Sequence, residues 1–221
     1  MSSLIIVESH NDKFFIEKLR DKLNLVNIKI ENPICNLTDY ECLDGLSEKK
    51  LSSTLLEVKF DKYKKIGIII DADNVSIENR ISLVNKCVKS LENIPNDFNL
   101  TNINQLIRIE ELDIEIGCYI TNVDGKGELD TVLKTIANQD STFADCLNAW
   151  KSCLESKGKS IKEKDFIKFW VNNYLRFDTC KKSEQSQANS KCKNEQAIKK
   201  DIWNLDDPIL NDLKEFLKLL S

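Results

Sequence analysis

The stretch Ile66-Gly67-Ile68-Ile69-Ile70-Asp71-Ala72-Asp73-Asn74 decides which fold we expect for this chain. A short apolar run that is rich in β-branched residues is typical of a strand buried on both faces of a parallel sheet. The run ends at Asp71 and Asp73, with one small residue between them. Because α/β proteins bind ligands just beyond the carboxyl ends of their strands, these two aspartates are candidate site residues.

Strands and helices alternate on either side of this stretch. Further strands are predicted at residues 4–7, 26–30, 106–109 and 114–120, and helices after residue 7 and at about 47–60 and 76–91. The order β-α-β-α-β-α-β-β predicts an α/β fold with a mainly parallel central sheet that is flanked by helices. The last two strands are expected to form a hairpin.

The remainder of the chain is predicted to be helical, because apolar residues recur there at helical spacing in four segments. We therefore expect an α/β domain over residues 1–125 and a helical C-terminal extension over residues 126–221, packed together as one globular unit. The helices of the extension either cover a face of the sheet or form a small lobe beside it. A chain of 221 residues is long enough for both parts.

Acidic residues follow two of the predicted strands. Glu8 ends the first strand, Asp12 comes four residues later, and Asp71 and Asp73 end the strand at 66–70. If the two strands are neighbours, these carboxylates converge and repel one another unless they gain protons or a cation. Carboxylate oxygens and water are the ligands that Mg²⁺ prefers. We therefore predict a Mg²⁺ site, with Mn²⁺ as the alternative ion. Two such ions would allow in-line displacement at phosphorus.

Simpler explanations exist for each of these acids. Asp73 or Asn74 is also a suitable N-cap for the helix that follows, a role that contributes about 1 kcal/mol. Asp12 and Asp71 could instead lie in solvent near helix N-termini, where negative charge is favourable. The order of Glu8 and the Asp-x-Asp pair along the chain favours the metal site over these explanations.

The net charge and the cysteine content argue against several classes of function. The net charge of −4 argues against tight, non-specific binding of nucleic acid, although a contact bridged by Mg²⁺ remains compatible with it. None of the eight cysteines forms a Cys-x-x-Cys pair and His10 is the only histidine, so a zinc site has poor support. The cysteines are expected to be reduced, mostly buried thiols. With no apolar run near the roughly 20 residues that cross a bilayer, we expect no membrane contact and a cytoplasmic location.

Two segments resemble the motifs of TOPRIM domains. LIIVESHNDKFFIEKL, which begins at Leu4, resembles their first motif, an apolar strand that ends in Glu. IGIIIDADN, which begins at Ile66, resembles their second motif, a strand that ends in Asp-x-Asp. The resemblance implies that Glu8 is a general acid/base or a metal ligand and that Asp71 and Asp73 bind Mg²⁺. Ser9 stands where TOPRIM domains usually have glycine.

The whole chain resembles the small bacterial family called domain of unknown function 3226. That family has Gly-x-Leu-Glu before a helix, and here Gly127-Glu128-Leu129-Asp130 occupies the corresponding place. The resemblance implies that either Asp130, which falls on that family's Glu, or Glu128, two residues earlier, completes a second metal position. Acidic residues are also common at a helix N-terminus for purely electrostatic reasons.

These features lead to competing functional hypotheses. The first is a Mg²⁺-dependent nuclease that acts on phosphodiester bonds of nucleic acid and uses Glu8, Asp71 and Asp73, supported by Asp12 and the acids after Gly127. The second is a TOPRIM-like module that keeps the acids but binds or regulates a protein partner in a DNA-maintenance or defence complex. A third is a phosphohydrolase that acts on a small nucleotide. The oligomeric state does not follow from the sequence.

Overall fold

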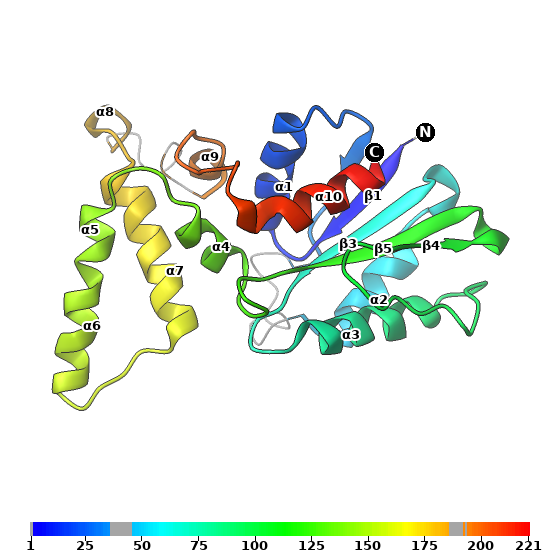
Figure 1. Cartoon of the computed structure of the whole chain (residues 1–221), viewed down its shortest axis with the longest axis horizontal. Helices are drawn as coiled ribbons and strands as arrows, with labels where there is room; N and C mark the ends of the chain where they lie inside the picture. The colour runs from blue at the N-terminus through cyan, green and yellow to red at the C-terminus, as the bar shows by residue number, and fades with distance from the viewer. Residues whose placement is uncertain (1, 36–45, 186–191, 193) are drawn as a thin grey trace. The chain divides into compact units, whose positions relative to one another are not determined.

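The computed structural model describes residues 2–35, 46–185, 192 and 194–221 (Figure 1). The chain divides into two compact units. The first contains residues 1–128 and 208–221, and the second contains residues 129–207. The C-terminal segment therefore returns to the unit that contains the N-terminus.

A five-stranded sheet is the centre of the first unit. Its strands are β1 (Ser3–Val7), β2 (Ile28–Ile30), β3 (Lys65–Asp71), β4 (Leu106–Ile109) and β5 (Ile114–Thr121), in the spatial order β2-β1-β3-β5-β4. The pairs β1–β2, β1–β3 and β3–β5 are parallel, and β4 pairs with β5 in the antiparallel direction. This confirms the predicted α/β class, its mainly parallel sheet and its terminal hairpin.

Serine residues begin the helices that connect the parallel strands. Helices α1 (His10–Lys22), α2 (Glu48–Glu57) and α3 (Ile77–Lys89) follow Ser9, Ser47 and Ser76, respectively. The side chain of each serine accepts a hydrogen bond from the backbone N–H three residues later. Such an N-cap contributes about 1 kcal/mol to helix stability, because it satisfies a donor that has no partner inside the helix.

Helices cover both faces of this sheet. Leu51, Leu55, Val84 and Val88 from α2 and α3 pack in one hydrophobic cluster with every second residue of β1 and β3. Helix α10 (Asn211–Leu220) lies over the opposite face, beside α1 (Figure 1). Because successive side chains of a strand point to opposite faces, the continuous apolar runs of β1 and β3 supply both layers of the core.

Two glycines let α10 lie close to the sheet. A Cβ atom on Gly67 would meet the side-chain ends of Leu220 and Phe216. A Cβ atom on Gly117 would instead meet the backbone carbonyl oxygen of Gln105 and the side chain of Leu106. The missing side chains therefore make room for Phe216 and Leu220, which are fully buried.

The second unit is helical. It contains α4 (Leu129–Thr135), α5 (Thr142–Asp145), α6 (Leu147–Ser156), α7 (Glu163–Asn173), a π-helical turn (Tyr174–Asp178), α8 (Lys182–Gln185) and α9 (Asn194–Ile198). Tyr174 lies between Trp170 and Trp203, with ring centroids 5.3 and 5.4 Å away. Its hydroxyl donates to the carbonyl of Ile202 at 3.0 Å and accepts from the amide of Gln139 at 3.1 Å. Tyr174 therefore joins the end of α7 to segments near the beginning and the end of the unit.

The expectation of reduced cysteines is wrong for part of the chain. Cys180 and Cys192 are joined in a disulfide, and Cys35 is also disulfide-bonded. Cys87 and Cys118 are free and buried, as predicted. A spacing of 12 residues carries no sign that two cysteines meet, because only the fold brings their Cα atoms to 5.8 Å.

No helix among the described residues is both long enough and apolar enough to cross a membrane.

The two glycines under α10 predict a graded loss of stability. We expect Gly117→Ala to lower the free energy of unfolding by about 1–3 kcal/mol, because its new methyl group meets a backbone carbonyl that cannot move independently. Gly67→Ala should cost less, because it meets the flexible end of Leu220. Urea unfolding of both variants measures the difference. A larger loss for Gly67→Ala would show that α10, and not the Gln105 backbone, is the rigid neighbour.

Candidate metal centre at the carboxyl ends of the strands

Parallel pairing brings Glu8 and Asp71 to the same edge of the sheet. β1 and β3 are neighbours, with Val7 opposite Ile69. The Oε2 atom of Glu8 accepts a hydrogen bond from the backbone N–H of Asp71 at 3.0 Å. Each residue is only 9% exposed. The two acids that end separate strands in the sequence therefore lie side by side and largely out of solvent.

Asp12 is held at the start of α1 by a capping box with Ser9. Its Oδ2 atom accepts from the Ser9 backbone N–H at 2.9 Å and from the Ser9 hydroxyl at 2.5 Å. The Ser9 Oγ in turn accepts from the Asp12 backbone N–H at 3.3 Å. Ser9 has φ −127°, an extended conformation that does not require glycine. Ser9 therefore begins α1 without backbone strain, and it anchors an acid that is 4% exposed.

Asp73 is paired with a buried arginine that sequence reasoning missed. The Nη2 atom of Arg80 lies 2.5 Å from Oδ2 of Asp73, and the side chains are 8% and 14% exposed. The Nε atom of Arg80 also donates to the carbonyl of Ala72 at 3.4 Å. The sequence could have indicated that Arg80 is buried, because it lies on the apolar face of α3 formed by Ile77, Ile81 and Val84.

A tight hairpin brings Glu128 to the same edge. Val123 and Lys126 pair around a turn at Asp124 and Gly125, both with positive φ. Gly127 then exchanges two backbone hydrogen bonds with Asp73, each 2.7 Å long. Gly127 has φ +94°, which side chains disfavour. The glycine of the Gly-Glu-Leu-Asp segment therefore docks on the Asp-x-Asp loop, and Glu128 follows it at 7% exposure.

The structure unites five of the six predicted site residues in the first unit: Glu8, Asp12, Asp71, Asp73 and Glu128. Asp130 belongs to the second unit, where it lies in the first turn of α4. Negative charge at that position stabilises a helix N-terminus. The acidic site therefore consists of residues of the first unit alone.

Burial and mutual repulsion disfavour the ionised forms of these acids. Burial, reinforced by the charges of Asp12 and Asp73, raises the pKa of Glu8 to about 7. Burial and the charge of Glu128 raise the pKa of Asp12 to about 6, despite the hydrogen bonds from Ser9. The pKa of Asp71 lies well above its usual value, again chiefly because of burial and then because of its acidic neighbours. The cationic side chains near this edge therefore do not compensate the negative charge that the acids would carry when ionised.

An orphaned oxygen at the centre of the cluster fits a cation. The Oδ1 atom of Asp71 is buried and accepts no hydrogen bond from any of the residues that the structure describes. Leaving a buried acceptor without a partner costs about 1–3 kcal/mol, and more when it is charged. A hard divalent cation such as Mg²⁺ takes carboxylate oxygens as ligands. Glu8, Asp71, Asp12 and Glu128 are the side chains that could hold it.

The carboxylate oxygens of the sheet-edge acids do not lie close enough together to form a complete coordination shell. Among the described residues, only Cys180, Glu184 and Cys192 have three ligand atoms within 4.8 Å of one another. In that group the two sulfurs are joined in a disulfide and Glu184 forms an ion pair with Lys200. The carboxylates at the sheet edge must therefore rotate toward an ion, which suits Mg²⁺ bound partly through water or substrate phosphates.

A family profile described as "Protein of unknown function (DUF3226)" matches residues 2–221. The chain belongs to this family. The DUF3226 match covers both units and includes every acidic residue described above. No curated protein and no solved structure matches the chain. The DUF3226 assignment specifies no chemistry, so the functional argument depends on the site itself.

The raised pKa of Glu8 predicts how stability depends on pH. The folded state holds the Glu8 proton up to about pH 7, whereas an ordinary glutamate loses it near pH 4.5. Between these values the folded state binds more protons, so the free energy of unfolding falls as pH rises. We expect Glu8→Gln to remove part of this fall and to stabilise the chain at pH 8 by on the order of 2–3 kcal/mol.

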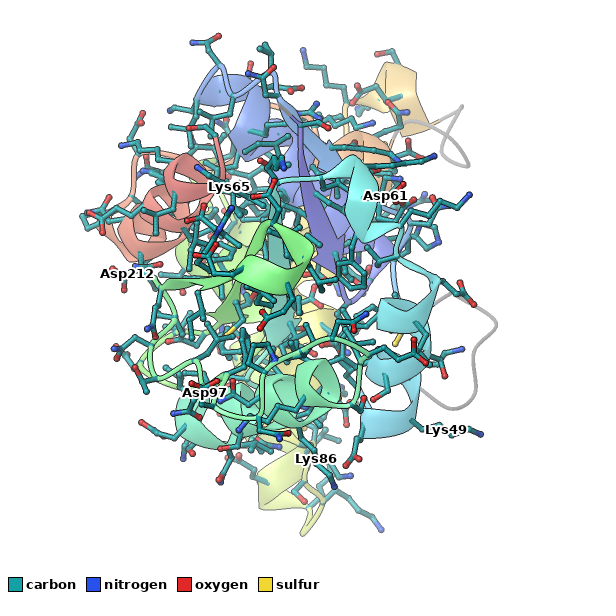
Figure 2. The ribbon with its side chains drawn as sticks, turned by 90° about the vertical axis from the view of Figure 1, so that its right-hand side faces the viewer. Lys49, Asp61, Lys65, Lys86, Asp97 and Asp212 are labelled. Carbon is teal, nitrogen blue, oxygen red and sulfur yellow. A yellow bond between two sulfur atoms is a disulfide. The ribbon has the colours of Figure 1, made fainter. Side chains whose placement is uncertain are left out.

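The matched control is Asp97→Asn, the same change of charge at an exposed position of the first unit (Figure 2). Thermal unfolding from pH 4.5 to 8 measures both variants. Equal pH dependence in the two variants would show that the Glu8 carboxyl titrates normally in the folded chain.

The Arg80–Asp73 pair predicts a strong energetic coupling. Arg80→Gln removes the cation that compensates a largely buried carboxylate, so we expect a loss of about 3–5 kcal/mol. The double variant Asp73→Asn/Arg80→Gln should lose less than the sum of the two single variants, because neither charge is then left uncompensated. Urea unfolding of the four proteins forms a double-mutant cycle. Additive losses would contradict a direct pair.

Proposed function

We propose that the chain is a Mg²⁺-dependent phosphoryl-transfer protein, and most specifically a nuclease that cleaves phosphodiester bonds of nucleic acid. The observation that carries this proposal is the buried, orphaned Oδ1 atom of Asp71 next to Glu8, at the carboxyl edge of a parallel sheet. Ligands of α/β proteins bind at this edge. A cluster of buried acids with too little positive charge suits a substrate that arrives with divalent cations.

The resemblance to TOPRIM domains supports the same proposal. In that superfamily the glutamate after the first strand and the Asp-x-Asp pair after a later strand belong to one site. Here Glu8 follows β1 and Asp71 ends β3, and these strands are direct neighbours. Asp73 departs from a simple metal ligand, since its carboxylate is paired with Arg80. The resemblance therefore extends most directly to Glu8 and Asp71.

In phosphodiester cleavage the acids and Arg80 would have different roles. Glu8, whose pKa burial raises to about 7 in the metal-free site, would exchange a proton with the attacking water or the leaving oxygen. Asp71, with Asp12 and Glu128, would hold Mg²⁺, which stabilises negative charge on the reacting oxygens when it is bound. Arg80 would meet the phosphate that replaces its contact with Asp73, because a guanidinium binds phosphate and carboxylate in similar geometry.

A second candidate is a binding or regulatory module without turnover. The Arg80–Asp73 ion pair favours it, because one acid of the Asp-x-Asp pair is already neutralised within the chain. In this case the partner is a protein of a DNA-maintenance or defence complex, and the acids serve in recognition or stability. Stoichiometric co-purification with another protein, together with no cleavage, would favour this module.

The nuclease proposal predicts a loss of activity on substitution of either central acid. We expect Glu8→Gln to reduce Mg²⁺-dependent cleavage by about 10²–10⁴-fold, the usual contribution of a general acid/base. Asp71→Asn should abolish both cleavage and the rise in melting temperature that Mg²⁺ or Mn²⁺ produces by binding the folded state. Single- and double-stranded DNA and RNA serve as substrates, and free nucleotides test the phosphohydrolase alternative.

Asp97→Asn is again the matched control and should keep full activity. The proposal fails if Asp71→Asn and Glu8→Gln both retain wild-type, metal-dependent cleavage. Calorimetric titration of Mg²⁺ into the wild type and Asp71→Asn then reports separately whether the acids bind an ion.

A further inference from the structure

The first unit contains a polar pocket that the acidic site does not use. It has a volume of about 670 Å³, within the range of ligand pockets, and lies between the β2 edge of the sheet and helix α2. Its walls include His10, Lys29, Lys50, Lys59, Lys62 and Tyr63. Helix α2, which carries the labelled Lys49, and the 3₁₀ turn at 60–62, which carries the labelled Asp61, lie on the same side of the unit (Figure 2).

The residues that line the pocket come from both ends of the parallel strands. His10, at one end, follows the carboxyl end of β1 and is two residues from Glu8. Lys62 and Tyr63, at the other end, precede the amino end of β3. The five residues of β1 between these ends span about 16 Å at the usual rise of a strand. This length suits several linked phosphates better than one.

The lining is basic although the chain is acidic overall. Four lysines and two glutamates line the pocket, an excess of two positive charges in a chain of net charge −4. Lys29 is paired with Glu31 at 3.1 Å. Lys59 and Lys62 have no acid within salt-bridge distance among the residues that the structure describes, and both are exposed. Their ammonium groups are therefore available to an anion.

An aromatic ring lies among these lysines. Tyr63 is half-buried, and the Nζ atom of Lys29 is 5.9 Å from its ring centroid and donates to its hydroxyl at 3.2 Å. A basic groove that contains an aromatic side chain is the usual means of binding a single strand of nucleic acid without regard to sequence. Lys59 and Lys62 lack an acidic neighbour within salt-bridge distance among the described residues, and a strand of phosphates would supply the negative charge.

We propose that this pocket binds the phosphates of a single-stranded segment of DNA or RNA, with Lys59 and Lys62 as its main phosphate contacts. The inference rests on the proposed function, since the bound strand would continue past His10 toward Glu8 and Asp71. It adds a substrate class to that function, namely a nucleic acid with an unpaired strand.

Fluorescence anisotropy of a labelled single-stranded oligonucleotide of about 12 nucleotides, a length within the usual site size, tests the proposal. EDTA in the buffer removes any contribution of metal binding or cleavage. We expect Lys59→Gln/Lys62→Gln to weaken binding at least about 10-fold at low salt. Its slope of log K against log salt should fall by about 0.7 for each lost phosphate contact. The control, Lys214→Gln/Lys218→Gln on α10, has the same change of charge and should bind like the wild type.

Unchanged affinity and salt slope in Lys59→Gln/Lys62→Gln would overturn the proposal, as would a wild type that does not bind the oligonucleotide. A mononucleotide that competes as well as the oligonucleotide at equal phosphate concentration would also overturn it, because the pocket then holds a single nucleotide. Binding that depends on Lys59 and Lys62 in a wild type that cleaves nothing would support the pocket and remove the nuclease. The two proposals therefore fail separately.

Discussion

Parallel pairing of β1 and β3 places Glu8 and Asp71 at one edge of the sheet, where neither acid can escape burial without breaking the register. The backbone N–H of Asp71 donates to Glu8, and this bond holds the Glu8 carboxyl group at the end of β3. Burial then raises the pKa of both groups. Some of the features around this edge respond to the buried acids, either by supplying positive charge or by holding the acids in place.

Two interactions at the carboxyl edge of the sheet have these effects. Arg80 extends from the apolar stripe of α3 and compensates Asp73, while Ser9 caps α1 and holds Asp12. The docking of Gly127 on the Asp-x-Asp loop adds a further acid, Glu128, instead of a cation. A fold that served stability alone gains nothing from this last step, because like charges destabilise one another at short range. An arrangement that adds acid to acid favours a cationic ligand.

Opposite charges are separated within the first unit. The lysines lie in the basic pocket beside α2, and the acids lie at the carboxyl edge of the sheet. A phosphodiester strand would be attracted by the lysines of the pocket, whereas the acids would repel it unless a divalent cation intervened. Such a division would let strand binding and metal-dependent chemistry be controlled separately. It also explains how a chain of net charge −4 could engage nucleic acid, since the local charge of the groove matters more than the total.

The sequence by itself determined the α/β class, the order of the strands along the chain and the acids that end them, because buried strands and capped helices leave local patterns. It also placed Glu8 and Asp71 at the ends of two strands. The two acids are neighbours only if those strands pair. The tertiary structure decided that pairing, the ion pair of Arg80 with Asp73, and the disulfide between Cys180 and Cys192. It also returned α10 to the first unit over Gly67 and Gly117. These are contacts between residues far apart in the chain or on different elements, and no local periodicity records which distant partner a side chain will meet.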